Sequence, residues 1–246
     1  MREARIYVDT PLAPGQRVRL PAGPTQHLVG VLRLAAGAEL ILFNGDGIDY
    51  RARLLDANRR GATAAIGEAG EIEPPPTLRL HLGIGISKGE RFDFALQKAV
   101  ELGVTEIHPL FTERTVVRLD AARLAKRLQH WSAIVIAACE QSGRRRLPRL
   151  AEAGRLSDWL AQHQPGGLLL DPRAEHALSD LPAPSGTLTL LVGPEGGLSE
   201  KERATARAHG FTGVRLGPRV LRTETAPLAA MAAIQALWGD FRAVPV

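Results

Sequence analysis

The sequence predicts an α/β protein in two parts: a small strand-rich barrel at residues 1–73 and a larger domain at residues 74–246. Three observations support this division. Short strand-like runs separated by turns fill the first part. The stretch GEIEPPPT, residues 70–77, contains three consecutive prolines, which favour an extended linker. Beyond it, strand-like and helix-like runs alternate, a pattern typical of a mostly parallel sheet with helices on both faces.

In the first part, short runs rich in apolar residues are bounded by turn residues. The turn Asn44-Gly45-Asp46-Gly47 is a strong hairpin signal. We expect one short helix to begin at Thr25, carrying Leu28, Val31 and Leu32. The predicted strands are 5–8, 17–20, 39–43, 48–54 and 62–66, which together suggest a small barrel.

In the second part, the helix pattern RFDFALQKAVELG places Phe92, Leu96, Ala99 and Val100 on one face and ends at Gly103. The predicted helices are 91–103, 121–138 and 226–238. The predicted strands are 78–86, 105–110, 168–170, 188–192 and 214–216. The last helix is apolar, which suits either a core or an interface between subunits.

The charge distribution favours a polyanionic partner. The net charge is +5, and residues 74–150 carry thirteen Lys and Arg against seven Asp and Glu. The excess is densest at Arg144, Arg145 and Arg146, and such a cluster attracts nucleic acid above all. The alternative is a solvated basic loop in an arginine-rich protein.

Several classes of protein are disfavoured by the sequence. No apolar run reaches the ~18–20 residues needed to span a bilayer. The N-terminal stretch MREARIYVDT does not resemble a secretory signal. Cys139 is the only cysteine, which favours a cytoplasmic setting, and no His/Cys cluster has the spacing of a metal site.

The stretch LVGPEGGLSEKE, residues 191–202, predicts a strand, a glycine-rich turn and a helix whose start is marked by a capping box of Ser199 and Glu202. Main-chain atoms in such a turn can approach a ligand closely. The phosphate-binding spacings G-x-x-x-x-G-K-[ST] and G-x-G-x-x-G are absent, and the turn carries the anion Glu195. A cationic ligand such as S-adenosylmethionine therefore fits better than a phosphate. The alternative is a tight connection that only needs glycine.

A second stretch, LGPRVLRTETAP, presents Arg222 and Glu224 just before the final helix, for which Thr225 is the expected N-cap. Open α/β sheets bind ligands beyond the carboxyl ends of their strands, where both stretches lie. Arg222 and Glu224 could instead form a surface ion pair, which would contribute little.

Together, LVGPEGGLS and LGPRVLRTETA resemble the signature of the RsmE family, methyltransferases of the SPOUT class. SKGERFDFALQKAVELGV, IHPLFTERT, AIVIAACEQSGRRRLP, RIYV and HLVGVLR agree with it, so the resemblance covers nearly the whole chain. It implies a PUA-like RNA-binding β-barrel followed by a SPOUT domain with a deep trefoil knot. It also implies methylation of a uridine at N3 in small-subunit (16S) rRNA, with S-adenosylmethionine as donor, by a homodimer.

The positions that match the family's cofactor site are Leu170, Gly193, Pro194, Glu195, Gly196, Gly197, Leu216, Gly217, Leu221, Arg222 and Thr223. For the chemistry, our hypothesis is that Glu224 accepts the N3 proton and that Arg222 stabilises negative charge on the uracil oxygens. Pairing of Arg222 with Glu224 stays open as an alternative, with Glu195 and Glu140 as reserve bases.

For RNA we expect contacts mainly with phosphates, because the chain has few aromatic residues for stacking. The candidate residues are Arg5, His27, Arg33, Lys88, Arg91, Arg114, Arg144, Arg145 and Arg146. Three alternatives remain open: a related methyltransferase acting on another rRNA or tRNA nucleotide, an RNA-binding relative without activity, and a nucleotide-phosphate enzyme.

Overall fold

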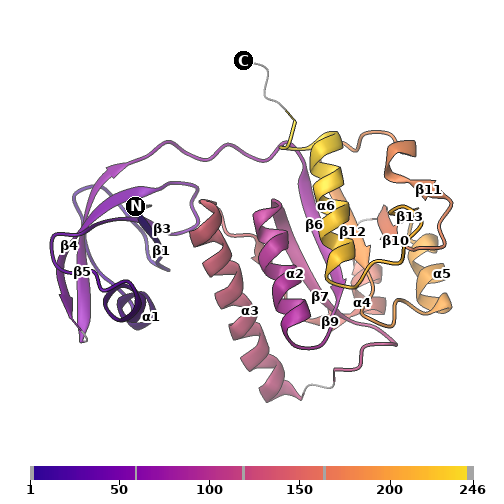
Figure 1. Ribbon diagram of the computed structural model, residues 1–246, viewed down its shortest axis with the longest axis horizontal. Coiled ribbons are helices and arrows are strands. Elements are labelled where there is room, and N and C mark those ends of the chain that lie inside the picture. Colours follow the sequence, from indigo (N-terminus) through magenta and orange to yellow (C-terminus); the bar gives the residue numbers. More distant parts are fainter. Residues whose placement is uncertain (1–2, 59, 118–119, 163–164, 243–246) are drawn as a thin grey trace. The chain divides into compact units, whose positions relative to one another are not determined.

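The computed structural model describes residues 3–58, 60–117, 120–162 and 165–242. The chain forms two compact units (Figure 1), the first made of Met1–Pro75 with Cys139–Leu147 and the second of Pro76–Ala138 with Pro148–Val246. The division therefore falls within the proline-rich stretch. Unlike the sequence-based boundary, it also assigns a segment from the middle of the chain to the first unit.

The first unit is built on one five-stranded sheet with the order β1-β3-β4-β5-β2. Its strands alternate buried and exposed residues; in β4, for example, Tyr50, Ala52 and Leu54 are buried between exposed Arg51 and Arg53. β1 pairs with β3 in parallel, and the other pairs are antiparallel. The strands are β1 (Ala4–Tyr7), β2 (Arg17–Arg19), β3 (Glu39–Phe43), β4 (Tyr50–Asn58) and β5 (Gly61–Ala69).

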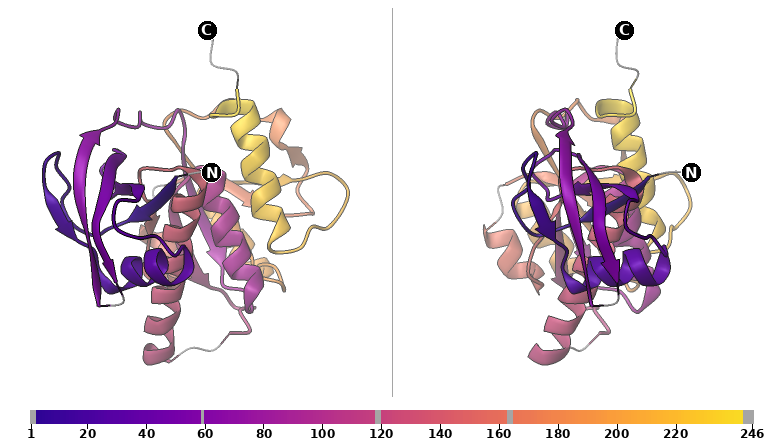
Figure 2. Two further views of the ribbon diagram at one scale, coloured as in Figure 1. Left: turned by 60° about the vertical axis from the view of Figure 1, so that its left-hand side comes forward. Right: turned by 90° about the vertical axis from the view of Figure 1, so that its left-hand side faces the viewer.

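The predicted hairpin turn and short helix are both present in the first unit. Asn44 to Gly47 connects the antiparallel strands β3 and β4, and Gly45 and Gly47 adopt the positive φ that such turns need. The helix begins at Ala22, three residues before the expected start, as α1 (Ala22–Gln26). It continues as the π-helical segment η1 (His27–Val31). α1 contacts β5, and the strands and helix of the unit can be followed in Figure 2.

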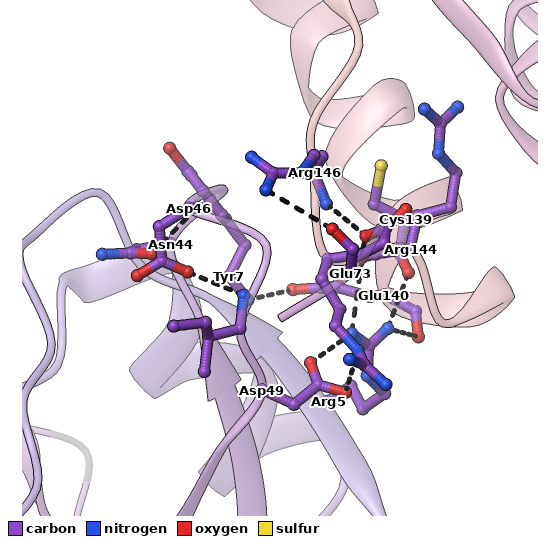
Figure 3. A network of polar contacts seen from close by, with 12 residues as sticks. Arg5, Tyr7, Asn44, Asp46, Asp49, Glu73, Cys139, Glu140, Arg144 and Arg146 are labelled. Carbon is purple, nitrogen blue, oxygen red and sulfur yellow. Dashed lines mark hydrogen bonds and ion pairs between the residues drawn. The ribbon is translucent and has the colours of Figure 1, made fainter. Parts of the chain in front are cut away.

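The segment Cys139–Leu147 is held against β1 by a network of polar contacts (Figure 3). The Arg5 guanidinium donates to the Cys139 carbonyl oxygen at 2.9 Å and pairs with Asp49 at 2.6 Å. Glu140 Oε1 accepts the Tyr7 N–H at 2.9 Å. Sequence reasoning missed this arrangement, because its partners are separated by more than 130 residues in the chain.

The second unit contains an eight-stranded sheet in which every described pairing is parallel. Consecutive residues of β12 are buried from Leu188 to Val192, so helices or loops cover both faces there. The order is β11-β13-β10-β12-β6-β7-β8, and β9 also pairs with β7. The strands are β6 (Arg79–Gly85), β7 (Val104–Phe111), β8 (Arg149–Leu150), β9 (Gly154–Arg155), β10 (Gly167–Leu170), β11 (His176–Ala177), β12 (Thr187–Val192) and β13 (Phe211–Arg215).

The helices of this part of the chain are α2 (Glu90–Glu101), α3 (Ala121–Ser142), α4 (Leu156–Gln162), the 3₁₀ turn η2 (Leu178–Asp180), α5 (Glu200–Ala208) and α6 (Thr225–Trp238). In Figure 1, α2 and α6 lie against each other in front of the sheet. The predicted capping box of α5 is confirmed: Ser199 accepts the Glu202 N–H, and Glu202 accepts the Ser199 N–H. The N-cap prediction for α6 is wrong by one residue, because Glu224 occupies that position and Thr225 is the first helical residue.

α6 contributes to the core through Met231 and Ile234, whereas Leu237 at its end is 40% exposed. Gln235 is buried and joins α6 to the end of α2 by donating to the Leu102 carbonyl oxygen at 2.9 Å. Among the described residues, no helix is long and apolar enough to cross a membrane. The adjacent parallel strands β13, β10 and β12 end at one edge of the sheet, so the loops that follow them lie together.

Candidate active site

A pocket of about 440 Å³ lies at the edge where β10, β12 and β13 end. This volume is within the ~300–1,000 Å³ typical of small-molecule sites. Three loops form most of its wall, and they follow β10 at Asp171, β12 at Gly193 and β13 at Leu216. Sequence analysis singled out the second and third of these loops, and Leu170 immediately before the first.

The glycine-rich loop after β12 is shaped by close approaches of backbone to backbone. Gly197 has a φ of +67°, and its N–H donates to the Pro194 carbonyl oxygen at 2.8 Å, which closes a tight turn. At Gly85, the end of β6, an added Cβ would lie 2.5 Å from both the nitrogen and the Cδ of Pro194. The loop therefore lies directly on β6, and its main chain lines the pocket.

Glu195 is held by neighbouring groups rather than left as a free anion. Its Oε1 accepts the Lys88 N–H at 2.9 Å and lies 3.8 Å from the Arg91 guanidinium. Arg114 donates to the Gly196 carbonyl oxygen at 2.8 Å. Three predicted RNA-binding residues thus gather at this loop. Because Glu195 is paired, its charge is a weaker argument against a phosphate ligand than the sequence suggested.

One carboxylate oxygen of Glu224, Oε2, is buried, and no described residue donates a hydrogen bond to it. Both Arg222 and Glu224 line the pocket, the Arg222 side chain being exposed. No ion pair joins these two described residues, so the simple pairing considered as an alternative is absent from this structure. A buried carboxylate oxygen without a hydrogen bond destabilises the folded protein, so we expect a bound ligand to supply the missing donor.

Thr223 ties the third loop to the first. Its hydroxyl donates to the Gly193 carbonyl oxygen at 3.1 Å. The Arg222 carbonyl oxygen accepts the N–H groups of Thr225 and Ala226, both at 2.9 Å, and so fixes the start of α6. These contacts hold the segment that carries Arg222 and Glu224 against the glycine-rich loop.

Beneath the pocket lies a buried ion pair that sequence reasoning missed. Asp171 Oδ2 lies 3.7 Å from Arg203 Nε, with both side chains less than 10% exposed, and 3.0 Å from the half-exposed Arg207. Arg203 also donates to the Leu198 carbonyl oxygen. Asp171 was detectable as a polar residue directly after a buried strand, whereas Arg203 is one of two arginines on α5.

Ten of the eleven candidate cofactor residues line the pocket. The exception is Gly217, which has a φ of +71° and serves the turn after β13. The ten are Leu170, Gly193, Pro194, Glu195, Gly196, Gly197, Leu216, Leu221, Arg222 and Thr223. No described group of three or more His, Cys, Asp or Glu side chains is arranged to hold a metal ion.

The candidate RNA residues of the first unit differ in their exposure. The Arg5 side chain is only 7% exposed, because it is enclosed by its contacts with Asp49 and the Cys139 carbonyl, so it is not available to a phosphate. The N–H groups of Arg145 and Arg146 donate to Glu73 Oε2, and both side chains are half-buried, like that of Arg144. His27 and Arg33 are exposed.

The reserve base Glu140 lies in the first unit, where its carboxylate accepts the Tyr7 N–H. Burial raises the pKa of this carboxyl, against smaller opposing effects of the Tyr7 hydrogen bond and of His27 and Arg5. In this structure the described contact of the Glu140 carboxylate is with the main chain of β1.

Comparison with known proteins agrees with this geometry. The model of an RNA methyltransferase domain matches residues 73–235, and that of an RNA methyltransferase PUA domain matches residues 25–67. The ribosomal RNA small subunit methyltransferase E of Buchnera aphidicola from Schizaphis graminum is 34% identical over 97% of this chain and 98% of its own. Its Bacillus subtilis counterpart is 30% identical over 85% of each.

Two solved structures are similar over 98% of this chain and all of their own. A ribosomal RNA small subunit methyltransferase E from Neisseria gonorrhoeae, bound to S-adenosylmethionine, is 42% identical with a TM-score of 0.91. A Legionella pneumophila protein, also in complex with S-adenosylmethionine, is 38% identical with a TM-score of 0.95. On its domain matches and its full-length relatives, the chain belongs to the family of ribosomal RNA small subunit methyltransferases E.

Proposed function

We propose that this protein transfers a methyl group from S-adenosylmethionine to N3 of a uridine in 16S ribosomal RNA. One observation carries the proposal. The pocket beyond β10, β12 and β13 combines a wall of bare main chain with the unpartnered buried oxygen of Glu224. The S-adenosylmethionine complexes of the Neisseria and Legionella proteins support the choice of cofactor.

The residues of the pocket fit this cofactor. The glycine-rich loop and the loop after β13 offer backbone N–H and carbonyl groups, and Leu170, Leu216 and Leu221 offer apolar surface for a flat ring system. Arginines on the rim can pair with a carboxylate. We assign the binding role to the ten candidate residues that line the pocket. The bound cofactor would supply an electrophilic methyl group.

The target nitrogen needs a base. Neutral uracil N3 carries a proton, and its lone pair is delocalised into the two flanking carbonyls, so the proton must leave for the nitrogen to react. Glu224 Oε2 is the group we propose to receive it. General bases of this kind typically contribute about 10²–10⁴-fold to the rate.

Arg222 is proposed to stabilise the negative charge that then spreads over the uracil oxygens. Its side chain is exposed, lines the pocket and is in no ion pair with a described residue. A guanidinium can donate a charge-assisted hydrogen bond to one of the uracil carbonyl oxygens, onto which the negative charge spreads.

The substrate RNA would approach across a cationic rim. Arg215, Arg219 and Arg222 are exposed, line the pocket and form no ion pair with any described acid. Lys88, Arg91 and Arg114 stand beside the glycine-rich loop. Phosphate contacts from such residues give affinity that falls steeply with salt. We infer that the small ribosomal subunit, or its precursor, carries the target.

Three further properties belong to the proposal. A trefoil knot is supported by the strand order, in which β13 lies outside β10, and by the contact of Thr223 with Gly193. A homodimer is supported by the exposed apolar residues Phe94 on α2 and Leu237 on α6. A cytoplasmic location follows from a ribosomal RNA substrate. A monomer in sedimentation at micromolar concentration would contradict the dimer.

The decisive experiment joins two measurements. Calorimetric titration should show binding of S-adenosylmethionine by the isolated protein. Mass mapping of nucleosides in 16S RNA from cells lacking the protein should show the loss of one N3-methyluridine, restored by the wild-type gene. Binding without a lost modification would favour another RNA target, and failure to bind the cofactor would favour an RNA-binding protein without activity.

A further inference from the structure

A second pocket, of about 580 Å³, lies entirely within the first unit. Three elements form it: the end of β2, the face of α1 and η1, and the start of β5. The lining residues are Arg19, Leu20, Ala22, Thr25, Gln26, Val29, Gly30, Arg60 and Gly61. None of the candidate RNA residues from the sequence is among them.

The charge of this pocket is positive. Arg19 and Arg60 are exposed, and neither forms an ion pair with any acid in the described part of the chain. No acidic residue occurs among the described lining residues. Two unpaired guanidinium groups at one cavity attract an anion and suit a phosphate in particular.

The floor of the pocket is apolar, and its one hydroxyl group is hydrogen-bonded within the protein. Leu20 and Thr25 are buried, and the Thr25 hydroxyl donates to the Leu20 carbonyl oxygen at 3.2 Å. A ligand would therefore find its polar partners on the rim, in the two arginines and the Gln26 amide. A cavity with an apolar floor, two cationic groups and one amide matches a flat base joined to a phosphate.

The wall is also built from small residues that leave space. A Cβ added at Gly30 would meet only the Gln26 side chain, at 3.9 Å, so the volume above Gly30 is open. At Gly61 the nearest group to an added Cβ is the Arg19 guanidinium, at 3.6 Å. Gly30 lies in η1, and π-helical segments are rare and frequently found at functional sites.

We propose that this pocket binds one nucleotide of a single-stranded RNA segment and that Arg19 and Arg60 contact the phosphate and the base of this nucleotide. The inference rests on the proposed function for the choice of RNA. A free mononucleotide offers the same base and phosphate as a nucleotide within RNA, so it is the competing candidate for the ligand of this pocket. An arginine plane can stack on any base, which makes the contact tolerant of sequence and suitable for anchoring RNA away from the reacting uridine.

The chain offers a matched pair of variants for each feature. Gly30→Leu fills the open volume, whereas Gly23→Leu adds the same side chain to exposed Gly23 of α1, which does not line the pocket. Arg19→Ala removes a lining charge, whereas Arg17→Ala removes the same charge from the same exposed side of β2 outside the pocket. Arg60→Ala provides a third test that leaves the helical segment untouched.

The probe is a fluorescent twelve-nucleotide single-stranded RNA carrying 4-thiouridine, titrated into the full-length protein without S-adenosylmethionine. We expect Gly30→Leu, Arg19→Ala and Arg60→Ala each to weaken binding about tenfold, and the two controls to stay within about twofold of wild type. Photocrosslinks should map to residues 19–30 or 60–61. Equal losses in pocket and control variants would overturn the proposal.

Competition with adenosine monophosphate separates the two sources. If the mononucleotide displaces the RNA crosslink at equal concentration, the pocket is a free-nucleotide site and the RNA assignment is wrong. Thermal melting and the S-adenosylmethionine affinity of each variant report its folding. Should Gly30→Leu fail to fold, the two arginine variants decide. If the wild-type protein transfers no methyl group, the proposed function is wrong. The RNA titration, in contrast, tests only this pocket.

Discussion

The Arg203 guanidinium joins two of the loops that form the main pocket. Its Nε lies 3.7 Å from Asp171 Oδ2 in the loop after β10, and another of its nitrogens donates to the Leu198 carbonyl oxygen after the glycine-rich turn. Both side chains are buried. A buried cation that contacts both loops fixes their spacing and thereby the width of the pocket.

We therefore expect Asp171→Asn to destabilise the protein and to weaken cofactor binding. The change removes the buried acidic partner of Arg203 and leaves the exposed Glu200, at 2.6 Å, as its ion-pair partner. We therefore expect a loss below the ~3–5 kcal/mol typical of a buried pair that loses one member, but above that of an exposed pair. Chemical denaturation and calorimetric titration with S-adenosylmethionine measure the two effects. Arg207→Ala is the control: this residue also contacts Asp171 but is half-exposed, so its loss should cost about 1 kcal/mol or less. Equal effects of the two changes would show that burial of the pair is unimportant.

Gly85→Ala should displace the glycine-rich loop without altering any group that faces the pocket. The new Cβ would lie 2.5 Å from the Pro194 backbone nitrogen, so either the loop or β6 must shift. Forced repacking of this kind typically costs about 1–3 kcal/mol, which we expect to appear as about tenfold weaker S-adenosylmethionine binding. Gly154→Ala, where an added Cβ meets nothing within 4 Å, should bind like wild type. Unchanged affinity in Gly85→Ala would separate the loop from the cofactor site.

Glu224→Gln tests the proposed base. The amide keeps the size of the side chain but cannot accept a proton, so the single-turnover rate should fall about 10²–10⁴-fold with little change in cofactor affinity. Glu195→Gln provides the contrast. This change weakens the contacts of Lys88 and Arg91 with the glycine-rich loop. It should therefore lower the affinity for S-adenosylmethionine more than the single-turnover rate. A Glu224→Gln protein that methylates at the wild-type rate would remove this residue from the chemistry.

Glu140 gives the network of the first unit a pH dependence. Burial raises the pKa of its carboxyl, so the folded protein holds this proton more tightly than the unfolded chain does. The contribution of Glu140 to stability is complete below the ordinary pKa of a Glu carboxyl and is lost as the pH rises through the raised folded-state pKa. Glu140→Gln should therefore melt at a higher temperature than wild type at pH 7, with the difference vanishing in acid. A lower melting temperature of Glu140→Gln than of wild type at pH 7, with the gap closing in acid, would mean that the ionised form is the stabilised one.

The regular elements and the pocket loops were largely predictable, because their signals are local. The limits 39–43 of β3 and the Ser199–Glu202 capping box follow from short patterns of a few residues. The candidate cofactor residues came from the resemblance of the two C-terminal motifs to the signature of the family. Their roles, like those of Arg222 and Glu224, remain proposals.

What the sequence could not give depends on partners far apart in the chain. Arg5 looks like an exposed basic residue of a strand, and only the folded chain brings it to Asp49 and Cys139. Arg203 has no local signal that distinguishes it from Arg207, the other arginine of α5. The helix α4 was missed because seven residues give too short a period to recognise. Such long-range contacts follow from the packing of the whole unit.

The most direct test of the account is a crystal structure of this protein with S-adenosylmethionine bound. We predict density for the cofactor against the main chain of Gly193–Gly197 and of residues 216–223, with its methyl group facing Glu224. A cofactor bound elsewhere, with both loops free of ligand, would contradict the central claim.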